Sequence, residues 1–131
     1  MPIEERLTST PGVFAIPGLA QAVVTSGRTA HISGQVPLDE DGNLVGAGDL
    51  RAQATQALTN LERVVKQLGA TWHDVVRFTW FTTDPHGVQT IRDVRDEFLG
   101  DAPKPGSSLI VVAGLFHPDV VFEVEAVVAL P

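Results

Sequence analysis

Apolar residues in the middle of the chain recur with the period of an α-helix. Between Leu50 and Leu68 they fall on one side of a helix with about 3.6 residues per turn. Asp49 is suited to cap the N-terminus of this helix, and Gly69 can adopt the left-handed conformation that ends one. The pattern therefore predicts an amphipathic helix. Its buried stripe comprises Leu50, Ala54, Ala57, Leu58, Leu61, Val65 and Leu68.

A shorter apolar stripe with helical spacing follows later in the chain and ends at Gly100. Asp84 offers an N-cap, and Pro85 after it suits the first helical position, where its missing N–H is harmless. We therefore expect the second helix to begin directly after Asp84. Its stripe comprises Val88, Ile91, Val94 and Phe98.

Runs of β-branched and apolar residues surround the two helical segments. Residues 20–25 and 29–33 form two such runs, and the Ser-Gly-Arg turn at 26–28 predicts that they pair as a β-hairpin. Further strands are expected at 74–82, 108–114 and 120–130.

The order of these elements predicts the fold class. Strands come first, followed by a helix, a strand, a second helix and the last strands. Two helices are too few to cover both faces of such a sheet, so we expect them on one face. The sequence thus predicts a single α+β domain over residues 1–131, with two helices packed on a mixed β-sheet.

The last predicted strand has one apolar side and one mixed side. Side chains alternate along a strand, so the even-numbered residues of 120–130 face the helices. Glu123 and Glu125 point to the other side, about 7 Å apart. The neighbouring run at 109–112 is apolar on both sides, which is typical of a strand buried on both faces. A partly apolar sheet face without helices predicts a homo-oligomer whose sheets pack inward.

Glu123 and Glu125 admit two interpretations. They are acid/base groups or ligand contacts in a cleft between subunits, or they belong to a solvated or ion-paired sheet face. Arg77, in the strand predicted at 74–82, is the cation available for such an ion pair. The residues alone leave both interpretations open.

Composition narrows the function classes. The net charge is −7, and the Lys and Arg residues are scattered, which argues against a nucleic-acid partner. The absence of cysteine excludes disulfides, thiolate nucleophiles and Cys-based metal sites. No apolar run approaches the roughly 20 residues that cross a bilayer, and the acidic N-terminus differs from a signal peptide. We expect a cytoplasmic protein without a membrane partner.

The histidines and serines show no established catalytic spacing. The 4 histidines lack the spacing of metal ligands, so no metal site is expected. Ser33, Ser107 and Ser108 lie outside a G-x-S-x-G nucleophile elbow. The sequence therefore contains no recognisable nucleophilic triad.

Several short segments occur in a distinctive order along the chain. In this order they resemble the RidA/YjgF family of reactive-intermediate deaminase (Rid) proteins, over residues 21–126. The segments are ISGQVPLD at 32–39, Gly42, Val-Gly at 45–46, residues 53–61 of the first helix, Gly-Ala at 69–70, DVVR at 74–77 and EVEA at 123–126.

The resemblance implies a chorismate-mutase-like fold and a homotrimer whose sheets pack into a central barrel, with small-molecule clefts between subunits. It also implies hydrolysis without a cofactor. Active family members convert enamine and imine products of amino-acid-degrading enzymes into 2-oxo acids and ammonia. Glu123 corresponds to the family's catalytic glutamate, which orients water.

Other family positions differ in this chain. Ser107 stands where the family has the Arg that holds the substrate carboxylate, and a hydroxyl cannot replace its bidentate contact. Leu19 occupies the place of a family Tyr, and Arg92 that of a family Asn. Arg92 and Lys104 are the cations that could replace the missing Arg. The expected substrate-binding residues are Ser107, Ser108, Ser33, Leu19 and Arg92.

Three functions follow from the resemblance. The favoured one is a divergent Rid homotrimer that binds or hydrolyses a small polar metabolite through Ser107, Ser108 and Glu123. The second is a true 2-iminobutanoate/2-iminopropanoate deaminase. The third, an endoribonuclease or translation inhibitor, fits the acidic composition poorly. Whether the chain is a hydrolase is left open by the loss of the Arg.

Overall fold

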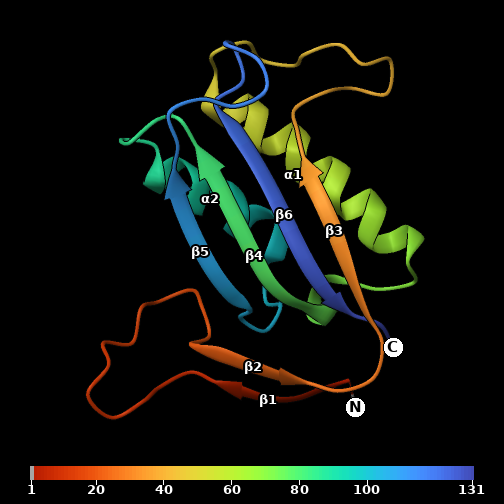
Figure 1. Ribbon diagram of the computed structural model, residues 1–131, viewed down its shortest axis with the longest axis vertical. Coiled ribbons are helices and arrows are strands. Elements are labelled where there is room, and N and C mark those ends of the chain that lie inside the picture. Colours follow the sequence, from red (N-terminus) through yellow and green to blue (C-terminus); the bar gives the residue numbers. More distant parts are fainter. Residues whose placement is uncertain (1) are drawn as a thin grey trace.

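A four-stranded sheet forms the base of the computed structural model, which describes residues 2–131. The strand order is β3-β6-β4-β5 (Figure 1). β3 (Thr29–Gln35) pairs antiparallel with β6 (Phe122–Ala129), and β6 pairs antiparallel with β4 (Val75–Thr82). β4 pairs in parallel with β5 (Gly106–Val111). The sheet is therefore mixed, and the α+β class predicted from the sequence is confirmed.

A separate two-stranded sheet contains β1 (Ile3–Leu7) and β2 (Ala22–Thr25). The predicted hairpin is wrong, because β2 pairs with β1 and β3 pairs with β6. Pairing with β6 is favourable for β3 because it places the strand over the core, where Ile32 is only 8% exposed. β1 was missed because its sequence is mostly charged.

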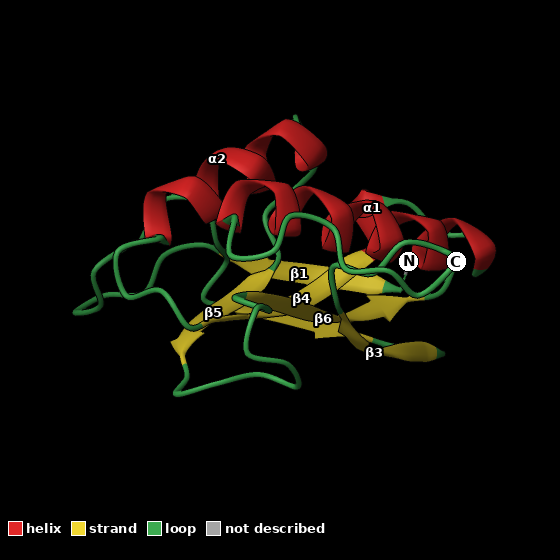
Figure 2. Ribbon diagram, turned by 90° about the horizontal axis from the view of Figure 1, so that it is seen from above, coloured by secondary structure: helices red, strands yellow, loops and turns green. Residues whose placement is uncertain are grey.

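Both helices cover the same face of the sheet (Figure 2). α1 (Leu50–Gln67) has the predicted caps: the Asp49 carboxylate accepts a hydrogen bond from the Ala52 N–H at 3.1 Å. Gly69 follows the helix with a φ of 76°. Within residues 2–131, no helix has the length and apolarity needed to cross a membrane.

α2 (Val88–Leu99) begins later than predicted. Asp84 does not cap it. The Asp84 carboxylate instead accepts the His86 N–H at 2.8 Å and closes a turn. Gly87 precedes the helix and lies against Leu50 of α1, where a Cβ would be 2.2 Å from the Leu50 Cδ2. The packing of this turn on α1 therefore decides where α2 starts.

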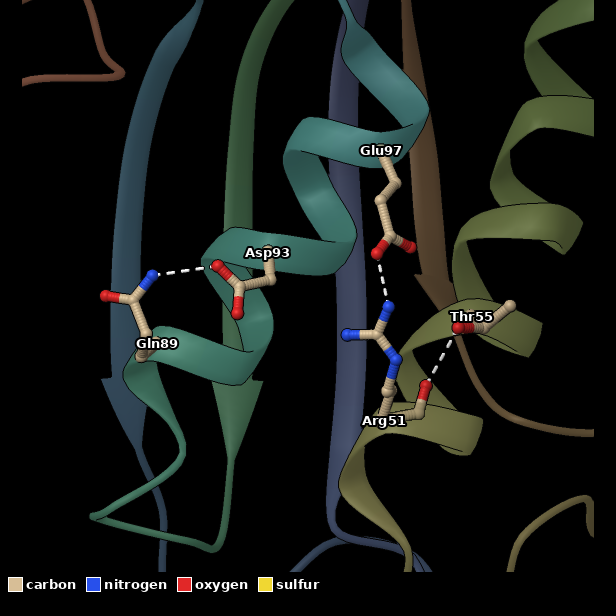
Figure 3. Close-up of polar contacts among 5 residues, drawn as sticks. All are labelled: Arg51, Thr55, Gln89, Asp93 and Glu97. Atoms are coloured by element: carbon tan, nitrogen blue, oxygen red, sulfur yellow. Dashed lines mark hydrogen bonds and ion pairs between the residues drawn. The ribbon is translucent and has the colours of Figure 1, made fainter.

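An ion pair connects the outer surfaces of the two helices, and further polar contacts lie within each helix (Figure 3). Arg51 of α1 forms an ion pair with Glu97 of α2, although both side chains are about half exposed. Gln89 donates a hydrogen bond to Asp93 one turn along α2, at 2.8 Å. An exposed ion pair contributes little free energy, so the apolar faces hold the helices in place.

Aromatic rings fill the space between the sheet and the helices. Trp80 and Phe78 of β4 pack in a tilted arrangement with ring centroids 4.7 Å apart, and Trp80 also lies beside Phe122 of β6. The α1 stripe packs over these rings. Its fully buried members, each at most 1% exposed, are Ala54, Ala57, Leu58, Leu61 and Val65.

β5 is an edge strand in the single chain. Ile110 and Val111 are 42% and 49% exposed, so the expected burial of 109–112 on both sides is not met within one chain. The reason is that β5 has only β4 as a neighbour in its sheet. Figure 2 shows that α1 and α2 lie on one face of the sheet and leave the other face uncovered.

Candidate functional site

A cavity of about 440 Å³ opens between α2, β5 and the loop at 16–19. Its volume is within the range of small-molecule sites. Leu19, Arg92, Ser107 and Ser108 all line it. The structure thus brings together four of the residues that the sequence nominated for substrate binding.

The two serines at the start of β5 have different partners. The Ser107 hydroxyl accepts a hydrogen bond from the Trp80 indole N–H at 2.8 Å. The Ser108 hydroxyl accepts one from the Arg77 guanidinium at 2.5 Å. Side chains alternate along β5, so the Ser107 hydroxyl lies on the helix-covered face with Trp80 and the Ser108 hydroxyl lies on the other face with Arg77. The Ser107 hydroxyl still has its own proton to donate to a ligand in the cavity.

Arg95 also lines the cavity, and the sequence analysis missed it. Its side chain is only 16% exposed, and its Nε donates to the Asp96 carboxylate at 2.9 Å. The guanidinium lies against Gly18, where a Cβ would be 2.9 Å from the Arg95 Nη2. The available signal was its spacing: three residues after Arg92 on a helix, it shares the same face.

A second hollow of about 330 Å³ adjoins this cavity, with which it shares Pro17, Arg92 and Arg95. Lys104 lines it as well. Three cations therefore gather at this hollow, against one lining carboxylate, that of Asp96, on a chain whose net charge is −7. Such a concentration of positive charge favours an anionic ligand.

Glu123 lies on β6, whose inward-facing neighbours Phe122 and Val124 are fully buried. Its carboxylate occupies space beside Gly34 of β3, where a Cβ would be 2.2 Å from the Glu123 Oε2. The register of β3 against β6 shifts at this point, between Ile32 and Gln35. A glycine in a strand irregularity thus makes room for the carboxylate.

The pKa of the Glu123 carboxyl is raised above its usual value of 4.5. Desolvation by burial is the larger cause, and the nearby Glu125 carboxylate is the second. The ion pair with Arg77, one of the alternatives left open by the sequence, is not formed in the described part of the chain, and Arg77 donates to Ser108 instead. Among residues 2–131, the ion pairs involve neither Glu123 nor Glu125.

Glu123 does not reach the cavity within one chain. The cavity adjoins β5, whereas Glu123 lies on β6, with β4 between them. Glu123 is also opposite Phe81, which pairs with Ile110 near the far end of β5 from Ser107. Ser33 lies exposed on β3, at the opposite edge of the sheet. The predicted site residues therefore fall into two separate groups.

The structure describes no cluster of three His, Asp or Glu side chains that could hold a metal ion among residues 2–131. The chemistry of the cavity wall is that of guanidinium groups, hydroxyls and apolar side chains. Such a wall can bind an anion and an apolar group, but it offers no carboxylate for proton transfer.

The raised pKa of Glu123 predicts how its replacement changes stability with pH. A raised pKa in the folded state means that stability is highest below about pH 4 and falls as the carboxyl ionises. Glu123→Gln removes this loss. We expect the variant to gain only a few tenths of a kcal/mol over the native chain between pH 4 and 7, because solvent still screens this partly buried group.

Urea unfolding at pH 4 and pH 7 measures this difference. The exposed turn residue Glu40 provides the control, and Glu40→Gln should show no comparable gain. A Glu123→Gln variant that loses stability relative to the native chain as the pH rises would contradict the assigned environment.

The fold and the cavity together define an α+β protein with a small-molecule-sized site at a sheet edge. The sequence profile of the Endoribonuclease L-PSP family matches residues 13–130. A 2-iminobutanoate/2-iminopropanoate deaminase of Dermatophagoides farinae is 32% identical over 126 residues, which cover 96% of this chain and 97% of that protein. The chain therefore belongs to this family, that of the RidA/YjgF (Rid) proteins.

Solved structures agree with this assignment. YyfB of Yersinia pestis, a Rid-family protein of unknown function, matches with a TM-score of 0.86 and 35% identity, over 99% of this chain and 100% of its own. RidA of an Antarctic Psychrobacter matches with a TM-score of 0.72 and 27% identity, over 98% of both chains. The Rid fold expected from the sequence is thus confirmed.

Proposed function

We propose that this protein is a divergent Rid enzyme that hydrolyses a 2-imino acid to a 2-oxo acid and ammonia. The observation that supports this proposal is that the cations and the catalytic carboxylate lie in different places. The cavity has cations and a serine hydroxyl on its wall but no carboxylate, whereas Glu123 lies elsewhere and, among residues 2–131, forms no ion pair. The similarity to the Dermatophagoides deaminase over 96% of the chain supports the reaction class.

The separation of Glu123 from the cavity also supports a site shared between copies of the chain. We propose that Glu123 of one copy completes the cavity of a neighbour in a homotrimer, the assembly implied by the Rid resemblance. The exposed Ile110 and Val111 of β5 supply apolar surface for such an interface. The sheet face that carries Glu123 has no helix over it (Figure 2).

In the proposed reaction, Glu123 moves protons while the cavity holds the substrate. Its carboxylate takes a proton from water as the water oxygen bonds to the C=N carbon. It then returns this proton to nitrogen. As the C–N bond breaks, the hydroxyl oxygen forms the C=O bond and gives its own proton through the carboxylate to the departing ammonia, so iminium and water become ketone and ammonium. A pKa raised toward neutral suits a group that acts first as base and then as acid.

The direct test is to add the protein to 2-aminoacrylate generated in the same vessel. We expect 2-oxo acid formation above the spontaneous rate, in proportion to protein concentration. The measurement is a coupled dehydrogenase assay for pyruvate, with heat-denatured protein as the control. A rate equal to the spontaneous one would exclude activity on this imine.

RNA cleavage, named in the family's description, is not part of the proposal. The net charge of −7 opposes binding to a polyanion. The cations at the cavity are confined to α2 and the loop at Lys104. They would contact a single anionic group more readily than a nucleic-acid backbone.

A further inference from the structure

We propose that Arg95, assisted by Arg92, binds the substrate carboxylate, and that the preferred substrate has a branched or aromatic apolar side chain. That the substrate is an imine rests on the proposed function. That it has a carboxylate and an apolar side chain is inferred from the cavity alone. The anion-binding cation would thus have moved from β5 to α2, where Ser107 faces it across the cavity.

The surroundings of Arg95 are those of an anion-binding group. Burial leaves its side chain 16% exposed, but its ion pair with Asp96 uses only Nε. A guanidinium has five N–H donors, and the two terminal nitrogens form the fork that matches a carboxylate. Asp96 is itself 68% exposed and so neutralises this charge weakly.

Gly18 holds the guanidinium in this position. Its missing side chain lets the plane of Arg95 approach, since Nη2, Nη1 and Cζ lie 2.9, 3.1 and 3.2 Å from where a Cβ would be. Similar distances to all three atoms place the group flat against the loop. A group fixed in this way loses little entropy on binding a ligand.

Most of the remaining wall is apolar. Leu19 takes the place of a family Tyr and so removes a hydroxyl from the cavity. The Trp80 ring is held by its hydrogen bond to Ser107. A three-carbon imino acid would leave most of the 440 Å³ to water. The other apolar lining residues are Ile16, Pro17, Val88, Ile91 and Leu109.

This arrangement predicts which ligands bind. Each CH₂ group buried in an apolar site strengthens binding about fourfold. A 2-oxo acid with a branched side chain should therefore bind at least about tenfold more tightly than pyruvate. Removal of the ligand's carboxylate should weaken binding at least about tenfold, because the Arg95 guanidinium then lacks the anion that it would bind.

Calorimetric titration of the native oligomer tests these expectations with three stable probes: 4-methyl-2-oxopentanoate, pyruvate and the neutral 4-methyl-2-pentanone. Arg95→Gln should weaken the binding of 4-methyl-2-oxopentanoate at least about tenfold without changing the affinity for the neutral ketone. Arg28→Gln, which removes the same charge from a distant turn, should leave all affinities unchanged. Arg92→Gln is the second variant, with a smaller loss expected because this side chain is exposed.

The outcomes separate this inference from the proposed function. Equal affinity for pyruvate and 4-methyl-2-oxopentanoate, or equal losses in Arg95→Gln and Arg28→Gln, would overturn the inference even if imines are hydrolysed. Binding as expected, with no hydrolysis of imines made from alanine or leucine, would support the ligand class and reject the enzymatic function.

Discussion

Glu123→Gln is expected to lower kcat/KM for imine hydrolysis by at least about 100-fold. The amide keeps the size of the side chain and its place beside Gly34, but it cannot accept a proton from water. General acid–base groups contribute about 100- to 10,000-fold to rate. The loss should appear mainly in kcat, because the substrate carboxylate is held elsewhere, by α2. Initial rates with enzymatically generated 2-iminopropanoate measure both constants.

The matched control is Glu125→Gln, two residues along the same strand and on the same face. It removes the same charge but leaves the carboxylate beside Gly34 in place. We expect its kcat/KM to stay within about threefold of the native value. A Glu123→Gln variant that keeps more than a third of native activity would reject Glu123 as the acid/base group.

Mixed oligomers test whether Glu123 acts on a neighbouring copy. Leu19→Trp should block the cavity, so this variant and Glu123→Gln should each be inactive alone. Co-expression should restore part of the activity, because the intact cavity of a Glu123→Gln copy can meet the Glu123 of a Leu19→Trp copy. Sedimentation first establishes that both variants form the native assembly. Assembled but inactive mixtures would contradict a shared site.

Gln53→Ala is expected to destabilise the fold by about 2–4 kcal/mol. Gln53 is fully buried in α1. Its Nε2 donates to the carbonyls of Gly46 and Asp119, at 2.9 and 2.7 Å. Its Oε1 accepts from the Val121 N–H at 2.7 Å. Alanine would leave the partly buried Val121 N–H without its partner, remove one of the two hydrogen bonds that each carbonyl accepts and open a cavity, and these effects are costly.

The control for this prediction lies on the same helix. Gln67 is exposed at the end of α1, and Gln67→Ala should change the free energy of unfolding by less than about 0.5 kcal/mol. Urea denaturation compares the two variants. Similar midpoints for Gln53→Ala and the native chain would show that the loops at Gly46 and Asp119 do not depend on Gln53.

Much of the fold was predictable because its signals are local. The α1 stripe, its Asp49 cap and the glycine at its end lie within one stretch of sequence. The structure contains all three, except that Leu68, predicted as the last member of the stripe, follows the helix and is 38% exposed. The alternation of β6 likewise identified the buried side of that strand. The pairing of β2 and the start of α2 were predicted wrongly, because contacts with β1 and with Leu50 decide them.

The candidate site was likewise predictable from the sequence only in part. Leu19, Arg92, Ser107 and Ser108 were nominated by their positions in the family pattern, and they line one cavity. Arg95 has no place in that pattern. Its role depends on burial against Gly18, a residue far away in the sequence.

By itself, the sequence determined the α+β class, the long helix, the family and the separation of apolar from charged positions along β6. These depend on periodicity and on short segments, which near neighbours in the chain suffice to define. Only the tertiary structure decided which strands pair, that Glu123 lies away from the cavity, and that the cations gather at α2. Those results depend on distances between residues remote in sequence, and such distances exist only once burial of the shared core brings the segments together.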